Sequence, residues 1–296
     1  MSREEYDERQ AMQQARYLEL IADYKSRVRG NAPGDAFSAA LLAAECAMLD
    51  NPPLSEAVDP DGKPSGIWKP RAKGLIHACR LPKPECRPFQ ADFSLIPTSE
   101  WQALVGGEDD VDMRRFVPDG MMLDQDAVGS CASEGMSGSI MASRVKAGQE
   151  PVKLNPWFAY HTVSGGSDQG SSLQDNVAFA QKYGVCSQAV YGRDKGWRAK
   201  PSEEAYEDAL KYRLTELWSI GNWESFGTAL LLGFPVYYGY SGHAIWATKL
   251  LDTGRFEYCN SWSEDWGDRG FGTLAKSKIV WNYGAYAFRV ATESEG

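Results

Sequence analysis

Residues 258–274 read YCNSWSEDWGDRGFGTL, and they say more about the fold than any other stretch of the chain. RFEYCNSW and FGTLAK have the aromatic and β-branched content of two strands, separated by Gly- and Asp-bearing turns. Taken alone, Asn260 is a turn residue, and Trp262 and Trp266 are ordinary core aromatics. A chemical role for Asn260 therefore requires a partner elsewhere in the sequence.

That partner is a histidine at the start of the preceding predicted strand. YSGHAIWATKL places His243 17 residues before Asn260. Two adjacent antiparallel strands can bring the start of one strand beside the end of the next. An asparagine oxygen that accepts from one imidazole nitrogen leaves the other nitrogen to face a sulfur.

The sulfur is found in DQDAVGSCASEG, residues 124–135. We expect a helix to start at Cys131 and stop at Gly148, so that its free backbone N–H groups and dipole favour a thiolate. A lone cysteine is usually an inert small hydrophobic residue. With His243 and Asn260 in the same chain, we interpret Cys131 as a nucleophile.

The order Gln125, Cys131, His243, Asn260 resembles that of the papain-like cysteine peptidases, over about residues 93–291. NSWSEDWGDRGFGTL is similar to the family's Asn-Ser-Trp, Trp-Gly, Gly-Tyr/Phe stretch. The resemblance implies that Cys131 is a thiolate paired with the His243 imidazolium, which later protonates the leaving amine. Asn260 would hold the imidazole ring. Gln125 and the Cys131 backbone N–H would stabilise the oxyanion.

The resemblance also implies a set of substrate-binding residues. Trp262 would cover the His243–Asn260 hydrogen bond, and Trp266 would wall the leaving-group side. Gly170 and Ser171 occupy the place of the family's paired glycines, which bind substrate backbone as an extra strand.

The sequence departs from the family pattern in several places. The family's Cys-Gly-Ser-Cys-Trp motif reads VGSCA here, at residues 128–132. The first cysteine of that motif forms a disulfide in the family. In this sequence valine replaces that cysteine, and Asp168 stands at the position of its disulfide partner. A lost disulfide fits a reducing compartment. His243 lies 112 residues and Asn260 129 residues after Cys131, against about 130–150 in the family. The chain between GFPVYYGY and SGHA is shortened, which bears on substrate range.

Helices precede strands along the chain, which predicts an α+β fold. The resemblance makes it a papain-like two-lobed fold, with a helical lobe carrying the cysteine and an antiparallel β lobe carrying the histidine and asparagine. Further helices are expected at LNPWFAYHTV, with Asn155 as cap, at SSLQDNVAFAQKYGV, with Ser171 or Ser172 as cap and Gly184 as end, and at SEEAYEDALKYRL. Strands are expected at PVYYGY, AIWATKLLD, RFEYCNSW, FGTLAK and YAFRVA.

We place a domain boundary after residue 92. Residues 1–92 form an N-terminal extension, with two helical stretches in its first 50 residues and Pro-rich, extended chain from Asn51. Residues 93–296 form the peptidase domain. The extension is an inhibitory pro-segment lying in the cleft, a docking arm for a partner, or a constitutive part of the fold, and the family's usual pro-segment motif is not found in it.

Composition excludes several classes of protein. The net charge of −9 and the lack of a basic stripe argue against nucleic-acid binding. No apolar run could span a bilayer and no signal peptide opens the chain, so we expect no membrane association and a cytoplasmic or particle-associated location.

Six cysteines and three histidines without a C-x-x-C pair predict neither a disulfide scaffold nor a zinc site, and no metal or organic cofactor is expected. Cys79 and Cys86 could bridge or stay reduced. The acidic run EDDVD from Glu108 reads as a solvated loop, with calcium binding as a remote option. His161, Cys186 and Cys259 read as structural.

The leading interpretation is a cysteine endopeptidase that hydrolyses polypeptides through a thioester acyl-enzyme. The alternative is a papain-like scaffold that serves as a structural or interaction protein with little or no proteolysis. A third reading keeps the acyl chemistry but passes the acyl group to another acceptor, as in transamidation.

Overall fold

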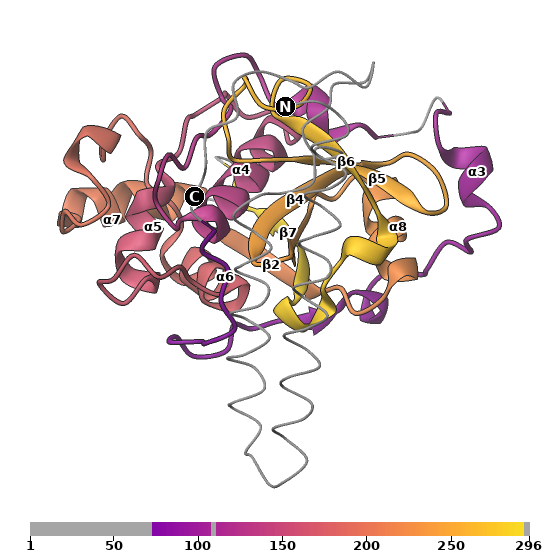
Figure 1. Ribbon diagram of the computed structural model, residues 1–296, viewed down its shortest axis with the longest axis horizontal. Helices are drawn as coiled ribbons and strands as arrows, with labels where there is room; N and C mark the ends of the chain where they lie inside the picture. Colours follow the sequence, from indigo (N-terminus) through magenta and orange to yellow (C-terminus); the bar gives the residue numbers. More distant parts are fainter. Residues whose placement is uncertain (1–72, 108–110, 293–296) are drawn as a thin grey trace, which may run out of the picture. The chain divides into compact units, whose positions relative to one another are not determined.

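The computed structural model describes residues 73–107 and 111–292. The helices expected in the first 50 residues, and part of the acidic run from Glu108, lie outside the described residues. The described part of the chain combines helices with one seven-stranded sheet, which confirms the α+β prediction (Figure 1).

The strand order in the sheet is β1-β2-β7-β3-β4-β5-β6. Neighbouring strands are antiparallel, except that β1 runs parallel to β2. All five predicted strands are present, as β3 to β7. The strands are β1 Arg87–Pro88, β2 Leu214–Ser219, β3 Val236–Tyr240, β4 His243–Leu250, β5 Arg255–Cys259, β6 Phe271–Ala275 and β7 Ala285–Val290.

The helices predicted around the cysteine and after it are also present. The α-helices are α3 Trp101–Leu104, α4 Cys131–Lys146, α5 Pro156–Val163, α6 Leu173–Tyr183, α7 Glu203–Ala209 and α8 Trp223–Leu231. The 3₁₀ turns are η2 Phe89–Ala91, η3 Met113–Phe116, η4 Arg193–Lys195, η5 Leu210–Tyr212, η6 Lys276–Lys278 and η7 Trp281–Tyr283.

Capping side chains fix where these helices begin. The Asn155 side chain accepts the Trp157 N–H at the start of α5, and Pro156 takes the first helical position. The Ser172 side chain accepts the Asp175 N–H at the start of α6, which ends at Gly184 with a positive φ of 76°. These boundaries agree with the sequence.

One predicted helix was too long, and two helices, the short α3 and α8, were not predicted. The helix expected through residue 214 ends at Ala209, and a 3₁₀ turn leads into β2, which pairs with β7. Leu214 and Leu217 are buried there, so tertiary packing overrides the helical pattern. The α8 helix was not predicted; the Asn222 side chain caps it, and Phe226 is among its buried residues.

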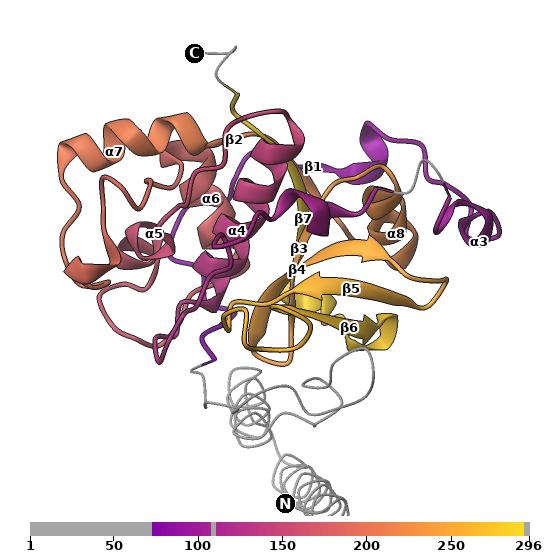
Figure 2. The same ribbon diagram turned by 90° about the horizontal axis from the view of Figure 1, so that it is seen from above.

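Helix α4 lies against β3 and β4, with α5, α6 and α7 on its far side and α8 across the sheet (Figure 2). Its glycines make this close approach possible. A Cβ at Gly138 would stand 2.9 Å from Trp246 Nε1, and a Cβ at Gly135 would stand 3.2 Å from the Tyr237 ring. Buried hydrophobic residues form two clusters, one around α4 to α6 and one between the sheet and α8. The division into two lobes stays a prediction.

Candidate active site

Cys131 is the first residue of α4 and is fully buried. Burial raises the pKa of its thiol to about 11, although hydrogen bonds from the backbone of Ala244 and Gly74 act in the opposite direction. The sulfur therefore lies beside the residue that follows His243. In this arrangement the neutral thiol is the favoured form.

The structure brings His243 and Asn260 together, as the strand order predicted. His243 opens β4, Asn260 follows the antiparallel strand β5, and His243 Nε2 lies 2.8 Å from Asn260 Oδ1. Asn260 Oδ1 also accepts the Ser261 N–H at 2.8 Å, which identifies it as the oxygen. Nε2 therefore carries the proton, and Nδ1 presents a lone pair.

The lone pair on Nδ1 is the available base of this site. Nδ1 is buried and has no hydrogen-bond partner among the described residues. Burial lowers the pKa of His243 to about 3, against the opposing effect of the Asn260 hydrogen bond. The imidazole is therefore neutral, able to take up a proton if the thiol loses one.

The carboxamide of Gln125 is held in one orientation. Its Oε1 accepts from Ser261 Oγ at 2.8 Å and from Trp262 Nε1 at 3.2 Å, and since indole N–H is only a donor, this atom is the oxygen. Nε2 donates to the Val128 carbonyl at 2.9 Å, so the donor end points toward the loop that leads into Cys131. Ser261 was not singled out from the sequence, although it follows Asn260 directly.

The two tryptophans line the same side of the site. Trp262 is tilted over the His243 ring, with centroids 4.9 Å apart, and shields it from solvent. Trp266 packs edge-on against Trp262 at 5.5 Å and also contacts Tyr258. Trp262 is thus in direct contact with the imidazole, and Trp266 supports it from behind.

Gly170 and Ser171 form backbone contacts with the chain's own N-terminal segment. Ser171 N–H donates to the Gly74 carbonyl at 2.7 Å, and Ile76 N–H donates to the Ser171 carbonyl at 3.2 Å. Leu75 pairs with Ser171 in parallel orientation. The edge expected to bind substrate backbone is therefore occupied, a contact that no sequence motif around Gly74 signalled.

The fit of this segment is tight. A Cβ on Gly74 would stand 1.8 Å from the Gly129 carbonyl oxygen, so no other residue fits that position. Leu75 is buried against Gly239, and its N–H donates at 3.0 Å to the carbonyl of Gly242, which precedes His243. The segment thus lies between the Cys131 side and the His243 side of the site.

We call residues 73–86 the strap. Beyond Ile76, the buried carboxylate of Asp175 on α6 accepts the backbone N–H groups of Arg80 and Leu81 at 2.9–3.0 Å. Further on, Gln181 and the backbone of Glu85 hydrogen-bond each other. The strap therefore runs from the candidate site along α6 to β1.

Asp168 has a structural function at the position where the resemblance places a half-cystine. Its Oδ1 accepts the Gly129 N–H at 2.8 Å and the Tyr160 hydroxyl at 2.7 Å. The Tyr160 hydroxyl in turn accepts the Gly170 N–H at 3.1 Å. Hydrogen bonds thus connect the loop before Cys131 to the loop of Gly170.

Of the other residues singled out from the sequence, Cys186 and Cys259 are buried thiols, as predicted, and His161 Nδ1 lies 3.3 Å from the Trp197 backbone carbonyl. Cys79 and Cys86 are free thiols. Within residues 73–107 and 111–292, no three His, Cys, Asp or Glu side chains gather to hold a metal ion, and no helix is long and apolar enough to cross a bilayer.

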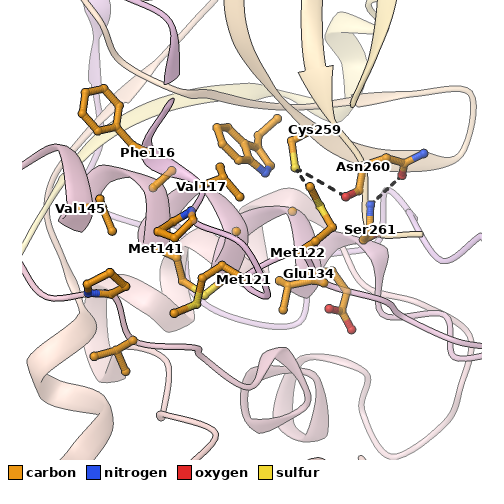
Figure 3. Close-up of a pocket in the computed structure, with 18 of the residues that line it drawn as sticks. Phe116, Val117, Met121, Met122, Glu134, Met141, Val145, Cys259, Asn260 and Ser261 are labelled. Carbon is orange, nitrogen blue, oxygen red and sulfur yellow. Dashed lines mark hydrogen bonds between the residues drawn. The ribbon is translucent and has the colours of Figure 1, made fainter. Parts of the chain in front are cut away.

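A largely apolar pocket lies behind the site, and Asn260 and Glu134 are among the residues that line it (Figure 3). Met121, Met122 and Met141 line it, and Cys259 Sγ lies 3.6 Å from Met122 Sδ. Cys131, His243 and Gln125 do not line this pocket. The strap lies instead against Gly129 and Gly242, close to Cys131 and His243.

The solved structures that this chain resembles in fold include a cysteine protease and two procathepsins. Xylellain from Xylella fastidiosa matches with a TM-score of 0.56 at 20% identity, over 76% of this chain and 100% of that chain. Procathepsin L2 of Tenebrio molitor matches with a TM-score of 0.56 at 14% identity, over 93% and 100%. Procathepsin L 3 of the same organism matches with a TM-score of 0.55 at 12% identity, over 95% and 99%.

The chain has a papain-like fold. No family model matches the sequence, and no curated protein matches it. The papain-like likeness thus comes from structure, at identities low enough that it establishes the fold and leaves the chemistry to be argued from the site.

Proposed function

We propose that this chain is a cysteine peptidase that hydrolyses peptide bonds. The observation that carries the proposal is the His243–Asn260 hydrogen bond, which leaves Nδ1 with a free lone pair at the start of β4, the strand that packs against the helix starting at Cys131. The papain-like fold supports the cysteine peptidase class, and the orientation of the Gln125 amide supports an oxyanion hole.

The proposed reaction has two steps. His243 Nδ1 takes the proton from Cys131 Sγ, which attacks the carbonyl carbon of the substrate. The resulting oxyanion accepts hydrogen bonds from Gln125 Nε2 and the Cys131 backbone N–H. The C–N bond breaks, the amine leaves with the proton from His243, and a thioester remains. Water, deprotonated by His243, then releases the acid and regenerates the thiol.

We also propose that the strap is an inhibitory segment rather than a docking arm. It takes the hydrogen bonds of Ser171 and Gly242 that a substrate backbone would need. Leu75 pairs with Ser171 in parallel orientation. The strap therefore runs through the site in the same direction as the segment that contains Ser171. Two of the similar structures are described as procathepsins, which fits this proposal.

The test compares peptide hydrolysis by chains with and without the nucleophile. Gly74→Val should dislodge the strap, since its Cβ cannot be placed beside the Gly129 carbonyl. In that background, Cys131→Ser should abolish cleavage of a fluorogenic peptide, and Cys79→Ser, at an exposed thiol, should leave it unchanged. Equal turnover with serine at position 131 would refute the peptidase proposal.

The competing function is a structural or interaction protein on the same scaffold. The complete burial of Cys131 and the raised pKa of its thiol favour this reading. Labelling by iodoacetamide separates the two proposals, because a structural thiol stays unreactive near neutral pH even when the strap is dislodged. Rapid labelling of Cys131 in the Gly74→Val chain supports the enzyme.

A further inference from the structure

A buried ion pair lies one turn into the nucleophile helix. Glu134, in the first turn of α4, has a fully buried side chain. Arg193, from the distant η4 turn, places Nη1 3.4 Å from both carboxylate oxygens. Ser130 Oγ donates to the same carboxylate at 3.0 Å. The proposed reaction uses none of these groups.

The same guanidinium also binds the segment that carries Gln125. Arg193 Nη2 donates at 2.6 Å to the carbonyl of Asp124, whose peptide bond leads into Gln125. The guanidinium lies over the Trp157 ring at 4.1 Å, and Trp157 Nε1 lies 3.3 Å from Ser130 Oγ. The planar guanidinium is therefore held in place by stacking on Trp157. Its Nη1 binds Glu134 of α4, and its Nη2 binds the segment before Gln125.

From the other side, the Gln125 peptide is held by Ser261, in the turn that follows β5. Gln125 N–H donates to the Ser261 carbonyl at 2.9 Å. Arg193 on one side and Ser261 on the other thus fix the residue between them. The two proposed oxyanion donors come from two separate segments, the Gln125 side chain and the Cys131 N–H, so their spacing depends on a connection between those segments.

We infer that Arg193 is a positioning residue for the oxyanion hole, because it ties the peptide before Gln125 to the first turn of α4. The inference rests on the proposed function, since Gln125 and Cys131 have that role only in a peptidase.

The test is Arg193→Lys in the Gly74→Val chain. Lysine keeps the positive charge but has no planar fork to bridge a carboxylate and a carbonyl. Two rates are measured: hydrolysis of a fluorogenic peptide, and alkylation of Cys131 by iodoacetamide, which forms no oxyanion. We expect kcat to fall about 100-fold, because the Gln125 and Cys131 N–H donors of the oxyanion hole would be misplaced. KM and the alkylation rate should stay within about twofold of those of the Gly74→Val chain.

The matched control is Arg198→Lys. Arg198 also stacks on a tryptophan, Trp197, at 4.1 Å. Its substitution should leave both rates unchanged. If Arg193→Lys does not fold, the double variant Glu134→Gln, Arg193→Gln removes both buried charges together and should show the same split between hydrolysis and alkylation.

Three results would count against the inference in distinguishable ways. Parallel losses of hydrolysis and alkylation would mean that Arg193 acts on the cysteine and histidine or on folding. No loss of either rate would remove any positioning role. If the Gly74→Val chain with Arg193 intact neither cleaves peptide nor alkylates, the proposed function fails first, and the inference falls with it.

Discussion

At the scale of single residues, burial decides the protonation of the candidate pair. Cys131 and His243 are both fully buried, and their pKa values move in opposite directions, to about 11 and to about 3. Both shifts favour the uncharged form. The thiolate–imidazolium pair implied by the family resemblance therefore remains a prediction for a site that is open to water.

The raised thiol pKa predicts an unusual pH profile for alkylation of the full chain. At pH 7, four units below a pKa of about 11, only about one thiol in 10⁴ is ionised, so labelling of Cys131 should rise about tenfold per pH unit up to strongly alkaline pH. In the Gly74→Val chain, water should reach the Cys131 thiol and lower its pKa. The rise in labelling with pH should then occur at pH 7 or below. Peptide mass spectrometry measures both profiles, with exposed Cys79 as internal control.

Identical pH profiles for Cys131 in the two chains would contradict this account. Cys131, His243 and Asn260 stand at element boundaries that the sequence predicted, whereas Gln125 was proposed from its place in the family order and lies in a loop. Their protonation was not predictable, because it depends on what covers them.

At the scale of elements, α4 depends on its glycines. Its intrinsic helix propensity is weak, and the sequence suggested that packing sustains it. The structure shows the reason, because a Cβ at Gly138 would overlap Trp246 of β4, and a Cβ at Gly135 would press against the Tyr237 ring of β3. The strands and most helices follow from periodicity and caps. Strand β2 and helix α8 do not, because pairing with β7 and burial against the sheet decide them.

Gly138→Val should therefore destabilise the protein. The Cβ would stand 2.9 Å from Trp246 Nε1, and relief of that overlap should cost about 1–3 kcal/mol. Chemical denaturation measures the loss in free energy of unfolding. Ser143→Val, on the partly buried face of the same helix, introduces the same side chain without that overlap. Equal stability of the two variants would mean that α4 does not depend on this close approach.

At the scale of the whole described chain, the strap connects parts that are far apart in sequence. It starts beside Cys131, binds Ser171 and Gly242, follows α6 and ends at β1, which pairs with β2. A Pro-rich segment predicts extended chain but not its path, since backbone hydrogen bonds to distant residues leave no pattern in the sequence. The sequence therefore left open whether the extension is a pro-segment, a docking arm or a constitutive part of the fold, and the contacts of the strap support our proposal of the first.

Asp175→Asn should loosen the strap at its far end. The carboxylate accepts N–H groups from Arg80 and Leu81, and an amide replaces one of its acceptors with a donor. Peptide hydrolysis should rise above that of the parent chain but stay below that of Gly74→Val, because Leu75 keeps its buried position. Gln181→Ala, which removes the exposed contact with Glu85, should give a smaller rise.

The decisive comparison places Asp175→Asn in the Gly74→Val chain. If Asp175 acts only by holding the strap, its substitution should change hydrolysis little once the strap is already dislodged, so the two effects on activity are not additive. Stability of the two chains is compared by thermal unfolding, to separate any loss at the start of α6 from the effect on activity. Full additivity in hydrolysis would show that Asp175 acts on the catalytic residues themselves, and the strap would then lose its proposed inhibitory role at this position.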